Sequence, residues 1–237
     1  MRKDEPKQQS SEIPRQRPRG GLFRRREILV PTWRGCLVLL VVCGLLLFVF
    51  TRVINPFLSV NDSKPGGVMV VEGWAPDFAL RQAMAEFGRE HYDKLYVTGG
   101  PLEQGAPLSE FKTYAELGTA TLVKFGFRTN DVQPVPAPGV AKDRTYSSAV
   151  ALREWWQQHG EPMPASLNLI TLGPHARRSR LLFEKAMGKK VAVGVISIDE
   201  HGYDQKHWWR TSQGVRTTIG EAVAYLYARL WFRAPKA

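Results

Sequence analysis

The sequence predicts an α/β protein with a Rossmann-like, three-layer arrangement. A mostly parallel five-stranded sheet lies between two layers of helices and is preceded by one transmembrane helix. Short apolar runs of strand length alternate, over residues 67–232, with segments whose apolar residues recur at helical spacing. Such alternation is typical of parallel strands joined by right-handed helical crossovers. Nearer the N-terminus, a longer uncharged run has the length of a membrane span.

The first 32 residues have the composition of a disordered, basic tail. Residues 1–34 contain ten Lys or Arg and four acidic residues, so they carry +6 of the chain's formal net charge of +11. Few of these side chains could enter a hydrophobic core. The charge lies beside an apolar run rather than on a folded face with interleaved aromatic residues. It therefore favours membrane orientation over nucleic-acid binding.

Seventeen uncharged residues, from Gly35 to Thr51, are bounded by Arg34 and Arg52. A spanning helix needs about 20 residues, with a lower limit near 17, so we expect an anchor over residues 33–55. The alternative is a cleaved secretory signal, but the run is longer than usual for one and no small residues follow it at cleavage spacing. With the basic tail in the cytoplasm, the protein would cross the inner (plasma) membrane once and place its domain outside.

Five strands are expected after a linker over residues 56–66. They are the apolar runs 68–71, 95–98, 132–138, 167–172 and 191–198. The third run contains three prolines, so its strand should be short or lie at a sheet edge.

Helical spacing of apolar residues predicts five helices between and after these strands. The second helix is expected to begin at Ser109 or a neighbour, and the third to be capped by Thr145. The last helix has an apolar stripe formed by Val215, Ile219, Ala222, Leu226 and Leu230.

Polar residues or glycines follow four of the apolar segments. They are Glu72, the Gly99–Gly100 pair, Arg144 with Thr145, and the segment from His175 to Arg178. In an open parallel sheet, ligands bind beyond the carboxyl ends of the strands, so these residues are expected to converge. His175, Arg177 and Arg178 also begin a helix, where free backbone N–H groups favour an anion.

Each candidate also has a structural interpretation. The glycine pair suits close approach to a ligand or a plain turn. His175 suits acid–base catalysis, hydrogen bonding to a phosphate or carboxylate, or a solvated helix start. The arginines suit bidentate anion binding or surface charge, and the glutamates suit ion pairing with them or acid–base chemistry. These residues are Arg81, Arg144 and Arg178, and Glu72 and Glu110.

The sequence lacks the common catalytic motifs. No G-x-G-x-x-G follows the first strand, and neither a Walker lysine motif nor a G-x-S-x-G motif occurs. Cys36 and Cys43 both lie in the apolar run, so the domain has no thiol for covalent catalysis. The residues show no spacing signature of metal ligands and assign no cofactor.

Five motifs, in order, resemble the YdcF-like family of envelope proteins (SanA, ElyC and YdcF type), whose reaction is not settled. They are Val-Met-Val-Val-Glu-Gly-Trp at 68–74, Val-Thr-Gly-Gly at 97–100, Ser-Glu at 109–110, Arg-Thr-Tyr-Ser-Ser-Ala at 144–149, and Thr-Leu-Gly-Pro-His-Ala-Arg-Arg-Ser-Arg at 171–180. The resemblance implies a Rossmann-like domain, often membrane-anchored, tied to envelope integrity and to peptidoglycan or lipid-carrier metabolism.

The resemblance also marks individual positions. It favours Gly99, Gly100, Glu110, Thr145, His175 and Arg178, with Arg81 and Glu221 aligned less closely. Two departures suggest a different ligand: Glu72-Gly73-Trp74 replaces the family's glycine-rich corner, and Ser148 stands where the family often has Asn.

The leading hypothesis is a membrane-anchored envelope protein that binds or acts on a phosphate-bearing anionic ligand, such as a lipid-linked carrier. His175 and Glu110 are the candidate catalytic residues. The candidate ligand-binding residues are Glu72, Arg81, Gly99, Gly100, Arg144, Thr145, Ser148 and Arg178. The alternatives are a non-catalytic module for a nucleotide-like ligand such as S-adenosylmethionine, with Glu72 on a ribose hydroxyl, and an envelope scaffold. Whether the protein is an enzyme stays open, as does its oligomeric state.

Arg178 and His175 are expected to bind an oxyanion together, with Arg144 and the glycine pair opposite. Loss of the Arg178 side chain would then weaken ligand binding and hardly change stability. The structural alternative is a buried ion pair, for which Glu110 is the candidate partner.

Overall fold

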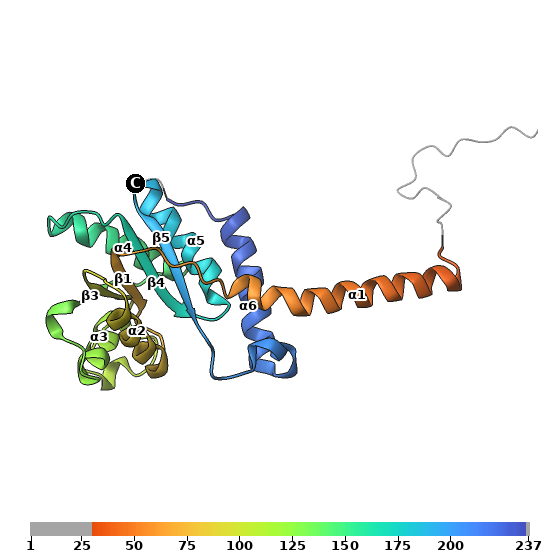
Figure 1. The fold of residues 1–237 in the computed structure, drawn as a ribbon, viewed down its shortest axis with the longest axis horizontal. Coiled ribbons are helices and arrows are strands. Elements are labelled where there is room, and N and C mark those ends of the chain that lie inside the picture. The colour runs from red at the N-terminus through yellow and green to blue at the C-terminus, as the bar shows by residue number, and fades with distance from the viewer. Residues whose placement is uncertain (1–29, 236–237) are drawn as a thin grey trace, which may run out of the picture. The chain divides into compact units, whose positions relative to one another are not determined.

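The structure is a computed structural model of the chain and describes residues 30–235. Most of the predicted basic tail, residues 1–32, lies outside the described residues. The chain divides into two compact units between Gly44 and Leu45, within helix α1 (Trp33–Leu58). The second unit contains the end of α1 and the whole α/β domain (Figure 1).

Within residues 30–235, α1 is the one helix long and apolar enough to cross a membrane. It ends at Leu58, beyond the predicted boundary at residue 55, and contains Pro56. Its last turn belongs to the domain, because Asn55 and Leu58 are buried and Asn55 Nδ2 donates to Thr218 Oγ1 at 3.0 Å. The predicted linker therefore begins later than expected.

The sheet has five parallel strands in the order β3-β2-β1-β4-β5. Their bounds are β1 Val68–Glu72, β2 Leu95–Gly99, β3 Val132–Pro136, β4 Ser166–Leu172 and β5 Ala192–Ile198. The order reverses between β1 and β4, which is the doubly wound topology of Rossmann-like folds. The proline-containing strand β3 lies at an edge, as its composition predicts.

Helices cover both faces of this sheet (Figure 1). Alternate strand residues face opposite helix layers, because side chains along a strand alternate in direction. On one face, strand residues such as Val70 and Leu169 pack with α4 (Arg144–Gln158) and α5 (His175–Met187). On the other face, α2 (Asp77–Arg89) and α3 (Tyr114–Lys124) pack on the remaining strand residues.

Helix α3 begins at Tyr114 and not near Ser109. A capping box fixes this start: Thr113 Oγ1 accepts from Glu116 N at 3.2 Å, and Glu116 Oε2 accepts from Thr113 N at 2.9 Å. Before it, Thr113 forms an isolated antiparallel bridge with Pro101, and the short 3-10 helix η1 spans Ala106–Leu108. The helical spacing of Phe111 with apolar residues from Tyr114 to Phe125 suggested an earlier start, but the capping box places the helix start later.

The predicted capping role of Thr145 is also wrong. Thr145 lies within α4, and Asp143 occupies the N-cap position with a left-handed φ of 58°. The Asp143 side chain makes no capping hydrogen bond. The first backbone N–H groups of α4 therefore have no side-chain cap.

Helix α6 (Ser212–Leu230) packs on α5 but not with its apolar stripe. Its buried residues are Gly214, Thr218 and Ala228, whereas four of the five predicted stripe residues are exposed. Helical periodicity alone therefore identified an apolar face without showing whether that face meets the core.

Candidate functional site

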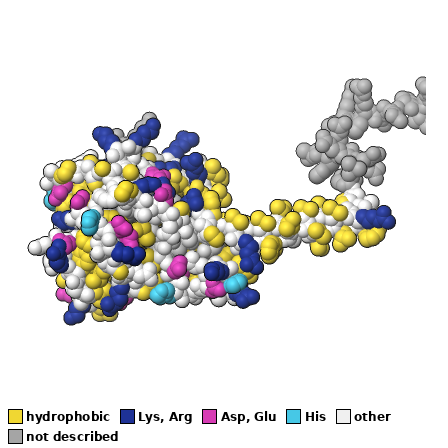
Figure 2. Space-filling model, viewed as in Figure 1, with side chains coloured by type: hydrophobic (Ala, Val, Ile, Leu, Met, Phe, Trp, Pro, Cys, Tyr) yellow, Lys and Arg dark blue, Asp and Glu magenta, His cyan; other side chains and the backbone are white. Residues whose placement is uncertain are grey.

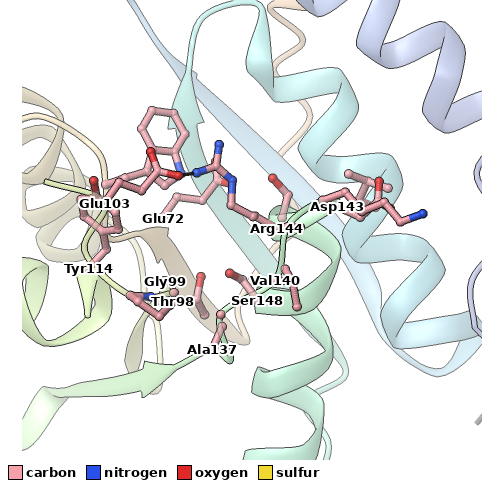
Figure 3. A pocket seen from close by; sticks show the side chains of 18 of the residues that line it. Glu72, Thr98, Gly99, Glu103, Tyr114, Ala137, Val140, Asp143, Arg144 and Ser148 are labelled. Atoms are coloured by element: carbon pink, nitrogen blue, oxygen red, sulfur yellow. Dashed lines mark ion pairs between the residues drawn. The ribbon is translucent and has the colours of Figure 1, made fainter. Parts of the chain in front are cut away.

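One cavity of about 1020 Å³ lies beyond the carboxyl ends of the strands (Figure 3). It is lined from β1, β2, the loop before α4, and the starts of α4 and α5, with one wall from α6. The predicted site residues that line it are Glu72, Gly99, Gly100, Arg144, Thr145, Ser148, His175 and Arg178. The four separate strand ends thus contribute to one cavity.

The sheet contributes three polar side chains to this edge. Glu72 and Thr98 are paired in register on β1 and β2, and Thr171 on β4 donates a hydrogen bond to Glu72 Oε2. These three side chains lie on the sheet face that packs on α4 and α5. Two positions earlier on each strand, that face carries an apolar or aromatic core residue: Val70, Tyr96 and Leu169. Glu72 is only 3% exposed. It also accepts from Ser179 Oγ at 3.3 Å, so its carboxylate is held in place by two hydroxyl groups.

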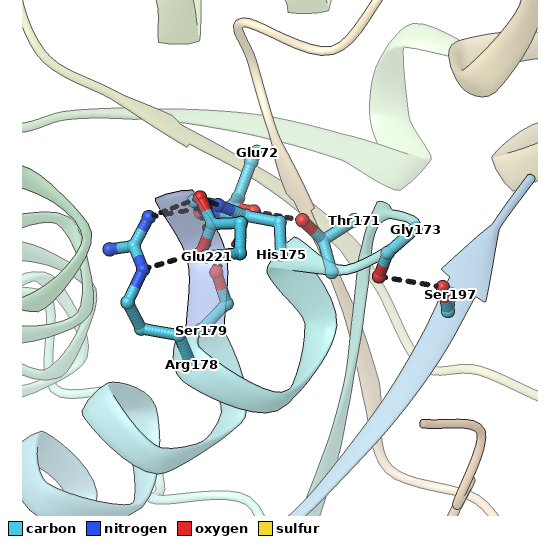
Figure 4. Close-up of polar contacts among 8 residues, drawn as sticks. All are labelled: Glu72, Thr171, Gly173, His175, Arg178, Ser179, Ser197 and Glu221. Atoms are coloured by element: carbon cyan, nitrogen blue, oxygen red, sulfur yellow. Dashed lines mark hydrogen bonds and ion pairs between the residues drawn. The ribbon is translucent and has the colours of Figure 1, made fainter. Parts of the chain in front are cut away.

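Four charged or chargeable side chains form a cluster beside this edge (Figure 4). His175 Nδ1 lies 2.9 Å from Glu221 Oε1, and His175 Nε2 lies 3.5 Å from Glu72 Oε1. Arg178 binds the Glu221 carboxylate bidentately, with Nε 2.7 Å from Oε2 and Nη2 3.0 Å from Oε1. When His175 is protonated, two positive and two negative charges balance.

The electrostatics favour a protonated His175. Burial alone would lower its pKa, but the carboxylates of Glu72 and Glu221 raise it from 6.5 to about 9. Burial would raise the pKa of Glu221, but His175 and Arg178 lower it to about 2. The pKa of Glu72 is likewise lowered, because its pairing with His175 outweighs its burial.

The ring nitrogens of His175 have different environments. Nδ1 is 2.9 Å from both Glu221 Oε1 and Arg178 Nη2, and a protonated ring donates there to Glu221. Nε2 is buried and has no hydrogen-bond partner among the described residues. Trp74 contacts the ring edge-on, with centroids 5.1 Å apart, and limits its movement. A proton on Nε2 is therefore buried beside the Glu72 carboxylate, at the edge of the cavity.

The start of α4 forms a second wall of the cavity. The uncapped backbone N–H groups beside Arg144 and Thr145 carry the positive end of the helix dipole. Lys142 and Ser148 line the same wall, and Arg144 forms an exposed ion pair with Glu103 across it. This wall provides hydrogen-bond donors and the positive end of a helix dipole, while Asp143 and Glu103 balance the charges of Lys142 and Arg144.

Thr98 completes the set of donors. Its side chain is 1% exposed and lines the cavity, and its Oγ1 has no hydrogen-bond partner among residues 30–235. A buried hydroxyl without a partner costs about 1–3 kcal/mol. An acceptor bound in the cavity would satisfy it.

The glycine pair has two different explanations. A Cβ on Gly99 would lie 2.7 Å from Tyr114 Cβ and 3.0 Å from Ala115 N, so this glycine allows α3 to pack against the end of β2. A Cβ on Gly100 would meet nothing closer than 3.7 Å. Helix packing therefore explains Gly99, whereas Gly100 leaves the cavity open.

Two predicted residues lie away from the cavity. Arg81 is exposed on α2, with its guanidinium 3.6 Å from the ring centroid of Phe125. Glu110 is exposed in the segment before α3 and does not pair with Arg178, whose partner is Glu221. Neither residue is among those lining the cavity. Arg177 also points elsewhere, because it stacks on Phe57 and donates to its carbonyl.

Sequence patterns did not single out Thr98, Lys142 or the pairing partner Glu221. Thr98 ends an apolar strand like many threonines, and Glu221 lies in an otherwise ordinary helix. For Glu221 the only signal was its weak alignment with the family motifs. No group of three or more His, Cys, Asp or Glu side chains suited to a metal ion occurs within the described range.

Comparison with protein-family models and with curated proteins finds no match for this chain.

Proposed function

We propose that this protein is a membrane-anchored binder of a phosphate-bearing anionic ligand, held in the cavity at the carboxyl edge of the sheet. The start of α4, Thr98 and Ser148 would bind the oxyanion, and His175 Nε2–H would donate to it from the opposite wall. The buried, unpartnered hydroxyl of Thr98 carries this proposal, since it lines the cavity that the uncapped N-terminus of α4 also lines.

The electrostatics of the cavity allow an anion because of the start of α4. Glu72 and Glu221 are matched by His175 and Arg178, so the cluster adds no net negative charge when the ring is protonated. Among the other lining side chains, Lys142 and Arg144 are matched by Asp143 and Glu103, so the dipole of α4 is what favours a negative ligand. Tetrahedral phosphate oxygens can accept several hydrogen bonds from such a set of donors.

The role of Arg178 differs from the sequence-based expectation. Its Nε and Nη2 both donate to Glu221, so it is first a structural partner of that carboxylate. We assign the ligand's direct contacts to the α4 wall and to His175 instead.

The pKa of His175 favours binding over acid–base chemistry. A catalytic acid or base works best with a pKa near the working pH. A ring with a pKa of about 9 stays charged at neutral pH and acts as a charged hydrogen-bond donor. Glu110, the other proposed catalytic residue, lies outside the cavity lining.

The N-terminal segment and the family resemblance bear on the location of the protein and on the class of its ligand. The basic tail before α1 supports a cytoplasmic N-terminus and a domain on the outer side of the inner membrane. The resemblance to the YdcF-like family and the apolar α1 support a role in the envelope, in peptidoglycan or lipid-carrier metabolism. A lipid-linked phosphate would suit both this location at the membrane and this role in the envelope.

A nucleotide-like ligand such as S-adenosylmethionine has less support. That alternative required Glu72 to be free for a ribose hydroxyl. Glu72 instead accepts from Thr171 and Ser179 and lies beside His175. Its carboxylate is occupied within the protein.

Replacing Thr98 by Val is expected to weaken binding of a prenyl phosphate about tenfold, since one hydrogen bond to a charged group is worth about 1.5 kcal/mol. Stability should not fall, because the hydroxyl has no partner in the ligand-free protein. Calorimetry of the full chain in detergent would use farnesyl phosphate as the probe, with farnesol and S-adenosylmethionine as comparison ligands. Chemical denaturation of the same samples would report stability.

Glu110→Ala is the matched control, because Glu110 is exposed and does not line the cavity. Its binding should equal that of the wild type. Equal affinity for farnesol and farnesyl phosphate would contradict the proposal that the protein recognises the phosphate group. Tight binding of S-adenosylmethionine alone would favour the nucleotide alternative.

A further inference from the structure

The exposed face of α6 carries a continuous apolar stripe. Its members, called the α6 stripe below, are Val215, Ile219, Val223, Leu226 and Leu230. They recur every three or four residues and so share one side of the helix. Their exposed fractions lie between 36% for Ile219 and 65% for Leu230. Trp231, 66% exposed, extends the apolar surface just past the end of the helix.

The opposite side of α6 already has its partners. Thr218 and Ala228 are buried against the domain, and Glu221 belongs to the charged cluster described above. The α6 stripe is most exposed toward its C-terminal end, at Val223 and Leu230. In the view of Figure 2, hydrophobic side chains lie beside basic ones on the side of the domain where the C-terminal half of α6 runs. Contiguous apolar surface of this kind marks an interaction site.

The structure fixes α6 to the segment that follows the apolar run of α1. Asn55 is hydrogen-bonded to Thr218, and Phe57 packs edge-on against Tyr225 with ring centroids 5.8 Å apart. Both α1 residues come within one or two turns of Thr51, where the uncharged run ends.

The short helix η4 (Gln205–Arg210), just before α6, contacts the same end of the run. Trp208 Nε1 donates to the Thr51 carbonyl at 2.9 Å, and the Arg52 guanidinium lies 5.3 Å from the Trp209 ring centroid. Tryptophan and arginine are typical of the membrane–water interface. Helix η4 and the start of α6 therefore lie where α1 would leave a bilayer.

Basic side chains flank the α6 stripe. Arg216 and Arg229 are exposed on α6 on its two sides, and Arg233 follows the helix. An apolar helix face with arginines at its margins suits the headgroup–acyl boundary of a membrane that contains anionic lipid. A second copy of the same stripe suits it less, because two such faces would bring these arginines together.

We propose that the α6 stripe binds the surface of the bilayer that α1 crosses, with Arg216 and Arg229 on anionic lipid headgroups. The partner is a lipid surface. The proposal rests on α1 crossing the membrane, which belongs to the proposed function. It is independent of the ligand in the cavity.

The test places a fluorescent label on the full chain in vesicles of phosphatidylcholine and phosphatidylglycerol. Val223→Cys, with Cys36→Ser and Cys43→Ser, carries a polarity-sensitive nitrobenzoxadiazole label on the stripe. We expect blue-shifted emission and quenching by lipids brominated on the acyl chain. Omitting phosphatidylglycerol should reduce both effects, because the arginines lose their anionic partners.

Two control labels make the outcome specific. The native Cys43, labelled in a Cys36→Ser chain, reports whether α1 is in the bilayer. Glu154→Cys, on an exposed position of α4, reports a part of the domain expected to stay in water. Quenching at positions 43 and 223 but not at 154 is the predicted result.

Quenching at 43 without quenching at 223 would overturn membrane docking while leaving the anchor intact. No quenching at either position would overturn the anchor itself. A blue shift at 223 that follows protein concentration and is insensitive to brominated lipid would assign the stripe to a second copy and contradict the proposal.

Discussion

Replacing Glu221 by Ala is expected to lower the free energy of unfolding by about 3 kcal/mol, the lower end for breaking a buried ion pair. Glu221 is the counter-ion of Arg178 and also contacts His175 Nδ1 at 2.9 Å. The Arg178 and His175 side chains are only 20% and 14% exposed, so water replaces the lost carboxylate poorly. The loss would be measured by urea denaturation of the full chain in detergent.

A double-mutant cycle separates this ion pair from general disruption. Glu221→Ala and Arg178→Ala should each destabilise the protein, and the double variant should cost less than the two losses combined because no charge is left unpaired. Glu221→Gln keeps the shape of the side chain and should cost less than Glu221→Ala. Additive losses would show that the two side chains do not act as a pair.

Stability is expected to fall by about 3 kcal/mol between pH 6.5 and 9, because about 1.4 kcal/mol corresponds to each unit by which a pKa changes. Burial opposes the charge on His175, but Glu72 and Glu221 raise its pKa from 6.5 to about 9. A group whose pKa is raised by folding stabilises the protein fully below its unfolded value. That stabilisation is lost as the pH rises through the folded value.

The pH dependence of stability has the opposite sign for Glu221, because folding lowers its pKa from 4.5 to about 2. Its contribution is present above pH 4.5 and is lost as the pH falls toward 2, so the cluster is most stabilising between about pH 5 and 6.5. Urea denaturation across pH 5.5 to about 9.5 would measure the alkaline side, and the matched variant is His175→Gln. A wild-type slope that persists unchanged in His175→Gln would show that another group causes it.

The fold was largely predictable because strand and helix formation follow local patterns. Apolar runs such as Val68–Val71 are the length of buried strands, and the edge position of β3 followed from its prolines. The topology then placed Glu72, Thr145 and His175 around one cavity, since parallel strands end at the same edge.

Helix starts were less predictable because capping decides them. The capping box of Thr113 and Glu116 overrides the apolar spacing that suggested a start near Ser109. Asp143 takes the N-cap of α4 in a left-handed conformation, which residue type alone does not reveal. Such details depend on backbone geometry.

The charged cluster was only partly predictable because it joins residues far apart in the chain. His175 and Arg178 were expected together from their spacing, but Arg178 meets Glu221 rather than Glu110. The position of α6 on α5 decides that pairing, and no local pattern encodes it. The same packing turns the stripe with Val215 and Leu230 away from the core.

Native mass spectrometry of the full chain in detergent tests the central claim most directly. The protein would be analysed as extracted and after incubation with farnesyl phosphate, beside Thr98→Val. We predict a phosphorus-containing adduct on the wild-type chain, with lower occupancy on Thr98→Val because the buried hydroxyl no longer donates to it. A wild-type chain without any such adduct in either sample, or equal occupancy in both proteins, would contradict a phosphate site at the carboxyl edge of the sheet.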